Sequence, residues 1–165
     1  MRCSLYLMSQ ELESMVKMLS DSPEDQRKSM ITERFKMIAS QPDEQRVGTV
    51  KGLVVAISKL DDRKRKEFVR TRTNAVAELP TETRKTIQAS RVKAGATLPQ
   101  DLNMRDMALT LEAAYLWPPE KRAMFKENLG AAFTEVGQPI PDFESITQTI
   151  PAGGEEKKRS RWKFW

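Results

Sequence analysis

The last residues of the chain mix cations with aromatic side chains in a way that suits an acidic surface. They follow a Pro- and Gly-containing stretch, residues 151 to 154. Guanidinium and ammonium groups pair with carboxylates or phosphates, while Trp and Phe rings bury in apolar grooves or at a membrane interface. We therefore predict docking on an acidic, grooved protein partner or an anionic membrane surface, with a disordered solubilising end as the alternative. The residues concerned are Lys157, Lys158, Arg159, Arg161, Trp162, Lys163, Phe164 and Trp165.

A second basic region lies in the middle of the chain. Residues 60 to 97 contain 10 Lys and Arg against 5 Asp and Glu. Such cations neutralise phosphates without regard to sequence, although a solvated helix face gives the same pattern. Aromatic residues that would stack on bases are not interleaved with them. Nucleic-acid binding is therefore the alternative function, and the candidate anion-binding patch is Arg63, Lys64, Lys66, Arg70 and Arg72.

The sequence offers little for catalysis. It contains 0 His, which removes the commonest general base and metal ligand, and it has no Gly-rich phosphate loop or dinucleotide fingerprint. Asp106 and Glu112 lie in an apolar stretch, where a buried carboxylate can be tuned for acid chemistry. We favour the interpretation that both point along a solvated or partner-facing edge. We expect no enzymatic activity, no cofactor and no metal.

These residues are carried by a repeat. Residues 22 to 135 divide into six segments of 19 residues without insertion or deletion. A strict period of this size predicts stacked supersecondary units. The second position of the segments reads Pro23, Pro42, Asp61, Pro80, Pro99 and Pro118, and the sixth reads Arg27, Arg46, Arg65, Arg84, Asn103 and Arg122.

Each segment is predicted to form one helix. Proline is favoured in the first helical turn, the acidic residues that follow it suit the positive end of the helix dipole, and apolar residues recur with helical spacing. A helix of about 16 residues leaves roughly three residues for the turn, so successive helices should run antiparallel. Further helices are expected at 9 to 20, opened by Ser9, and at 142 to 150.

The repeated arginine has a structural interpretation. A cation near a helix start opposes the helix dipole, so its partner should lie outside its own helix. The unpaired carbonyls at the end of the preceding helix are suitable acceptors. We therefore predict that these arginines clamp successive helices together. The apolar residues that precede the helix starts, Leu60, Leu79, Leu98 and Trp117, are expected to fill the core.

The helix starts resemble those of a known group of domains. Residues 79 to 84 and 117 to 122 share an apolar residue followed by Pro, an acid and Arg. This pattern is similar to helix starts in HEAT and armadillo-like domains, including the cytoplasmic helical domain of some magnesium transporters. The resemblance covers only these six-residue starts; it implies a helical array and transfers no site residue.

The predicted fold is all-α: tandem 19-residue single-helix repeats form antiparallel helical hairpins, closed as a short α-solenoid or a compact helical bundle. Residues 1 to 150 form the helical-repeat domain and 151 to 165 a Gly-hinged C-terminal tail. The composition is 39% apolar and 31% charged. The sequence contains no run of apolar residues long enough to span a membrane.

A single cysteine, Cys3, fits the cytoplasm or an equivalent reducing compartment, including an organelle matrix or stroma. Peripheral membrane association is compatible with the basic and aromatic tail. The expected function is a non-catalytic scaffold or assembly subunit. It would dock to a larger complex, membrane-associated or not, through its helical surface and its C-terminal tail.

Overall fold

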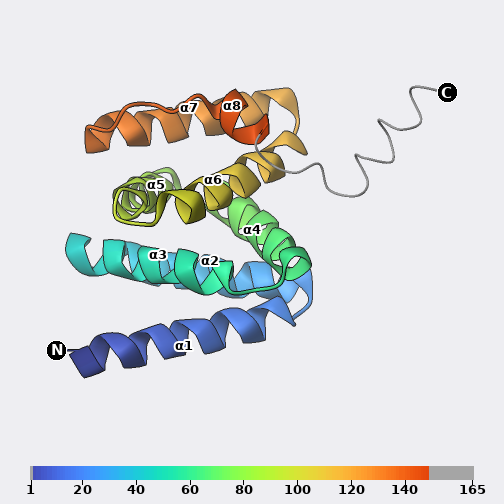
Figure 1. The fold of residues 1–165 in the computed structure, drawn as a ribbon. Helices are drawn as coiled ribbons and strands as arrows, with labels where there is room; N and C mark the ends of the chain where they lie inside the picture. Colours follow the sequence, from blue (N-terminus) through green and yellow to red (C-terminus); the bar gives the residue numbers. More distant parts are fainter. Residues whose placement is uncertain (1, 149–165) are drawn as a thin grey trace.

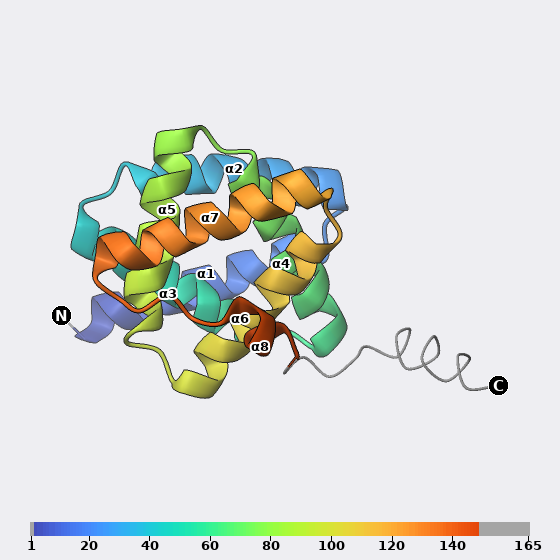
Figure 2. The ribbon, with the colours of Figure 1, turned by 90° about the horizontal axis from the view of Figure 1, so that it is seen from above.

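The computed structural model describes residues 2 to 148, with side chains described from Met8 onward. The regular elements of this part of the chain are all helices joined by turns and loops, without a strand (Figures 1 and 2). The all-α prediction is therefore confirmed. The helices are α1 (Arg2–Ser20), α2 (Glu24–Ala39), α3 (Asp43–Ser58), α4 (Asp62–Ala77), α5 (Thr81–Gly95), α6 (Gln100–Tyr115), α7 (Pro119–Val136) and α8 (Phe143–Gln148).

The repeated prolines cap the helices rather than occupy their first turn. Pro23, for example, has φ −55° and ψ 149° and directly precedes α2. Its carbonyl accepts the amide N–H of Arg27 at 2.9 Å, so the helical hydrogen-bonding pattern begins at the proline. Asp61 replaces proline before α4, and its carboxylate accepts the N–H of Lys64 at 2.9 Å. At the start of α4 a side-chain hydrogen bond therefore stabilises the first helical turn, whereas at the starts of the other repeated helices the fixed φ of proline favours it.

The first helix is longer than predicted. We expected it to begin at Ser9, but α1 begins at Arg2. The Ser9 hydroxyl does not cap a helix start; it donates to Glu13 from inside the helix, at 3.4 Å. No proline or glycine lies between residues 2 and 20 to stop the helix earlier. The closing helix α8 lies within the predicted range of 142 to 150, of which 149 and 150 fall outside the described residues.

The helices close into a compact bundle, one of the two closures expected. Each helix packs most extensively on the next but one, as α1 does on α3 and α4 does on α6, and less on its immediate neighbour. Figure 1 shows the resulting stack, with α1 at one side and α7 and α8 at the other. In Figure 2 the bundle is viewed along this stack, and α7 runs across α5.

The buried apolar side chains form two clusters. The first is built mainly from α1 to α5 and includes Val16, Phe35 and Ile57. The second belongs to α6, α7 and α8 and includes Leu111 and Phe125. The predicted core role of the residues before the helix starts is confirmed. Leu79 and Leu98 are buried, Leu60 packs on the first cluster and Trp117 on the second.

Candidate functional site

The arginines of the repeat column are buried or half-buried, and each donates to a backbone carbonyl that precedes its own helix. Arg27, Arg46 and Arg65 donate to the carbonyls of Ser22 at 3.2 Å, Gln41 at 2.7 Å and Leu60 at 2.7 Å, all in the preceding turns. Arg84 reaches the carbonyl of Ala77 at 3.1 Å and Arg122 that of Tyr115 at 3.3 Å, each the last residue of the preceding helix. The predicted bond to the end of the preceding helix is therefore confirmed for Arg84 and Arg122, whereas Arg27, Arg46 and Arg65 bond carbonyls of the turn before their own helix.

Four members of the predicted anion-binding patch are exposed or half-exposed on α4, and the fifth is buried. Lys64 pairs with Asp21 of α1 at 2.6 Å, and Lys66 pairs with Glu112 of α6 at 2.5 Å. The Lys64 ammonium, through its hydrogen bond and its charge, lowers the pKa of Asp21. Arg63 and Arg70 are exposed on α4, where Arg63 lies 3.9 Å from Glu67. Arg72, the fifth member, is buried in the bundle.

A buried ionic network occupies the junction of α4, α5 and α6. Arg72 donates to both carboxylate oxygens of Asp106, at 2.9 and 3.3 Å, and to the hydroxyl of Thr110 at 2.8 Å. Arg91 donates to Asp106 Oδ2 from Nε at 3.0 Å and from Nη2 at 2.8 Å. Asp106 is 7% exposed, so the expectation that it points along a solvated edge is wrong. Glu112, by contrast, is partly exposed.

The pKa of Asp106 shows how the network is balanced. Burial is the largest single influence and raises the pKa of this carboxyl, because it penalises the charged form. The charges of Arg72 and Arg91, with the hydrogen bonds that they donate, together outweigh burial and hold the pKa below its ordinary value. Asp106 is therefore an ionised carboxylate at neutral pH. This is the opposite of the raised pKa that a buried general acid needs.

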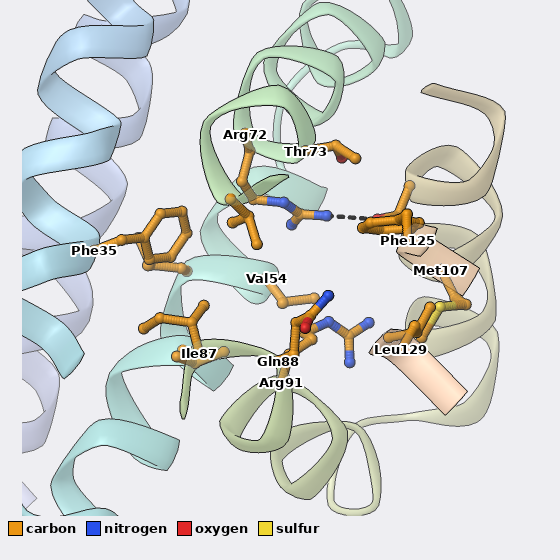
Figure 3. Close-up of a pocket in the computed structure, with 14 residues that line it drawn as sticks. Phe35, Val54, Arg72, Thr73, Ile87, Gln88, Arg91, Met107, Phe125 and Leu129 are labelled. Carbon is orange, nitrogen blue, oxygen red and sulfur yellow. Dashed lines mark hydrogen bonds between the residues drawn. The ribbon is translucent and has the colours of Figure 1, made fainter. Parts of the chain in front are cut away.

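A small cavity adjoins the network. Its volume is about 70 Å³, and both arginines line it together with Gln88 and Thr110. Its remaining wall is mainly apolar and comes from both core clusters, with Phe35 and Ile87 from the first and Met107, Phe125 and Leu129 from the second. Figure 3 shows the Gln88 amide and the two guanidinium groups pointing into the same space. The cavity and its polar wall thus lie at the seam between the two clusters.

Gln88 is the unusual group of this site. It lies in α5 and is 4% exposed, yet neither its amide nitrogen nor its amide oxygen has a hydrogen-bond partner among the described residues. Buried polar side chains are nearly always paired, so a pair of unsatisfied amide atoms calls for an explanation. Gln88 is not among the candidate residues that were predicted from the sequence.

The last described helix is firmly attached to the bundle. Ile146 of α8 is buried in the second cluster, and Phe143 packs on Phe133 with ring centroids 6.3 Å apart. The Tyr115 hydroxyl donates to Glu144 at 2.5 Å, and Lys126 pairs with the same carboxylate. The predicted partner-binding residues 157 to 165 lie outside the described residues.

The described helices contain neither a cluster of metal ligands nor a membrane-spanning segment. Between residues 2 and 148, no three His, Cys, Asp or Glu side chains are grouped as metal ligands. None of the helices in that range combines the length and apolar character needed to cross a bilayer. No protein-family model, curated protein or solved structure matches the chain. Architecture and site geometry therefore define its class, an all-α bundle of single-helix repeats with a polar seam.

Proposed function

We propose that the chain is a non-catalytic helical scaffold or assembly subunit that docks to a larger protein complex. The observation that carries the proposal is the attachment of α8, which ends at Gln148 and is separated by residues 149 to 154 from the basic and aromatic C-terminal segment, residues 155 to 165. A helix of six residues is not stable alone in water. The contacts of Glu144 and Ile146 with the bundle stabilise α8.

The anchored α8 keeps the chain attached to the helical body up to Gln148. The body itself has its repeated arginines engaged in internal clamps, so its repeat architecture serves folding. Docking specificity is assigned to the segment that departs from the repeat, with the helical surface as a secondary contact.

The chemistry of the C-terminal segment favours an acidic groove on a protein partner. Trp162 and Trp165 would provide buried apolar contact, and aromatic anchors dominate many interfaces. Lys157, Arg159 and their neighbours would provide the salt-sensitive part of binding. The same chemistry fits an anionic membrane surface, which the experiment below separates from a protein groove. Either site lies in the cytoplasm or an equivalent reducing compartment.

The test is deletion of residues 155 to 165. The truncated chain should keep its helical circular dichroism and its melting temperature, because α1 to α8 contain both core clusters. The truncated chain should no longer be retained in the native complex, as measured by affinity purification and quantitative mass spectrometry. A full-length variant with Trp162, Phe164 and Trp165 changed to Ala retains every cation and tests the aromatic contribution separately.

Two outcomes would contradict the proposal. If the truncated chain unfolds, the segment is an internal strap. If the deletion leaves co-purification unchanged, the docking surface lies elsewhere. Binding to vesicles with acidic lipids, absent with neutral lipids and accompanied by no protein partner, would transfer the docking site from a protein groove to a membrane surface.

Nucleic-acid binding is the alternative function and has less support. Lys64 and Lys66 pair with acidic residues of other helices, and Arg72 is buried. Binding of duplex or single-stranded nucleic acid near physiological salt, abolished by charge reversal at Arg63 and Arg70, would favour this alternative over the scaffold.

A further inference from the structure

The seam between the two core clusters has an excess of positive charge. Two guanidinium groups, those of Arg72 and Arg91, share the single carboxylate of Asp106. Thr110 and Asn103, the other side chains that accept from these arginines, are neutral. A buried charge without a full counter-charge is unfavourable. The seam would therefore be stabilised by one additional negative charge.

The cavity offers a place for that charge beside an unpaired hydrogen-bonding group. Gln88, Arg72 and Arg91 all line it, and the Gln88 amide points into it (Figure 3). A water molecule would satisfy the amide but bring no charge. A carboxylate would answer both needs, because it accepts hydrogen bonds from the amide N–H and from guanidinium groups.

The other walls select the rest of the ligand. Val54, Met107 and Leu129 are apolar and line the same cavity. An inorganic anion such as phosphate would direct some of its oxygens at these side chains, where they would be desolvated without a partner. A ligand with one charged end and one apolar end fits both walls.

The volume limits the ligand to a short one. The cavity of about 70 Å³ is roughly half of the 150 Å³ that accommodates benzene in an engineered protein cavity. We propose that the cavity binds a short-chain aliphatic monocarboxylate of two to four carbons, through Gln88, Arg72 and Arg91. Its carboxylate lies against these three side chains and its alkyl end against Met107 and Leu129. The site is independent of the docking function proposed above.

The test is titration of the full-length protein, labelled with ¹³C at its methionine methyl groups, with sodium propionate. Met107 lines the cavity and serves as reporter, while the exposed Met30, Met37 and Met124 are internal references. A ligand of five non-hydrogen atoms should bind with a dissociation constant of about 1 mM. We expect a saturable shift of the Met107 methyl signal, without comparable shifts of the references.

Two comparisons isolate the charged end and the amide. Propionamide has the same shape without the charge and should leave the Met107 signal in place. Gln88→Leu keeps the approximate volume but removes the amide, and binding should weaken by about tenfold or more, the scale for a hydrogen bond to a charged group. Gln45→Leu, an exposed glutamine of α3, is the matched control and should bind as the unaltered protein does.

Several results would overturn the proposal. One is a Met107 signal that stays in place, or drifts together with the reference methionines, up to about 50 mM propionate. If propionamide bound as tightly as propionate, the negative charge would have no role in binding. If inorganic phosphate bound as tightly and displaced propionate, the apolar wall would have no role. Unchanged binding in a folded Gln88→Leu variant would assign the shift to another site. If that variant does not fold, propionamide and phosphate still decide the question in the unaltered protein.

Discussion

Replacing Asp106 by Asn should be among the most damaging single changes in the described part of the chain. The carboxylate accepts four hydrogen bonds, two from Arg72 and two from Arg91. An asparagine keeps one accepting oxygen and turns an NH₂ group towards guanidinium donors. Buried Arg72 and half-buried Arg91 would then face each other without a counter-charge. Removing one partner of a buried ion pair typically lowers the free energy of unfolding by about 3 to 5 kcal/mol, and we expect a loss in this range.

The loss should depend on pH in a defined direction. The pKa of Asp106 is lowered in the folded protein from 3.8, so its ionised form is stabilised by folding. This contribution is complete above the unfolded-state pKa and disappears as pH falls through the folded-state pKa. The difference in unfolding free energy between the unaltered chain and Asp106→Asn should therefore be constant from pH 7 to about 5 and shrink below about 3.8.

Urea unfolding followed by circular dichroism at several pH values measures both effects. Glu78→Gln is the matched control, because Glu78 pairs with Lys28 at 2.7 Å with its side chain 52% exposed. Loss of such a surface pair should lower stability by no more than about 1 kcal/mol. The reasoning would be refuted if Asp106→Asn lost no more than this control, or if its deficit remained unchanged at acidic pH.

Two further predictions concern the helical framework. Arg46→Ala removes bonds to the Gln41 carbonyl at 2.7 Å and the Ser90 hydroxyl at 2.8 Å; urea unfolding should show a loss of about 1 to 3 kcal/mol, whereas exposed Arg70→Ala should change little. Gly48→Ala should raise stability by about 1 kcal/mol, because a Cβ there meets no atom within 4 Å in a helix interior. Gly52→Ala should gain less, since its Cβ would lie 2.7 Å from Leu12 Cδ1; equal gains in both variants would contradict the close packing of α1 on α3.

The helices and the arginine clamps could be predicted because both follow from local rules. The proline and arginine columns set the register, and the dipole argument predicted carbonyl acceptors at the end of the preceding helix, which Arg84 and Arg122 find. The N-terminal extension of α1 was missed because Ser9, a residue type favoured at helix starts, lies inside the helix and donates to Glu13 one turn later. The preference for next-but-one packing could not be read from the sequence, since short turns are equally compatible with neighbouring hairpins.

The seam left a signal in the sequence that a column-by-column comparison could have found. Arg72 and Arg91 occupy the thirteenth position of their segments, where the other segments have Arg34, which is exposed, and Leu53, Thr110 and Leu129. Asp106 occupies the ninth position, where Phe68 and Phe125 stand. Charged residues at core positions in three consecutive segments predict a buried ionic group. Which cation pairs with which carboxylate depended on the packing of α4 and α5 on α6, and the cavity beside Gln88 depended on side-chain shapes.

The single exception in the arginine column belongs to the same seam. The sixth position of the fifth segment is Asn103, and its side-chain oxygen accepts from Arg91 at 2.9 Å. The space is tight, because a Cβ on Gly95 would lie 2.8 Å from that oxygen and 2.9 Å from Arg91 Nη1. An arginine at residue 103 would bring a third guanidinium beside the two that already share Asp106. Asparagine instead supplies an acceptor, so Arg91 links α5 to the start of α6 while still reaching Asp106. The repeat therefore has asparagine instead of arginine at the one position where a further arginine would add positive charge beside Arg72 and Arg91, which already share a single carboxylate.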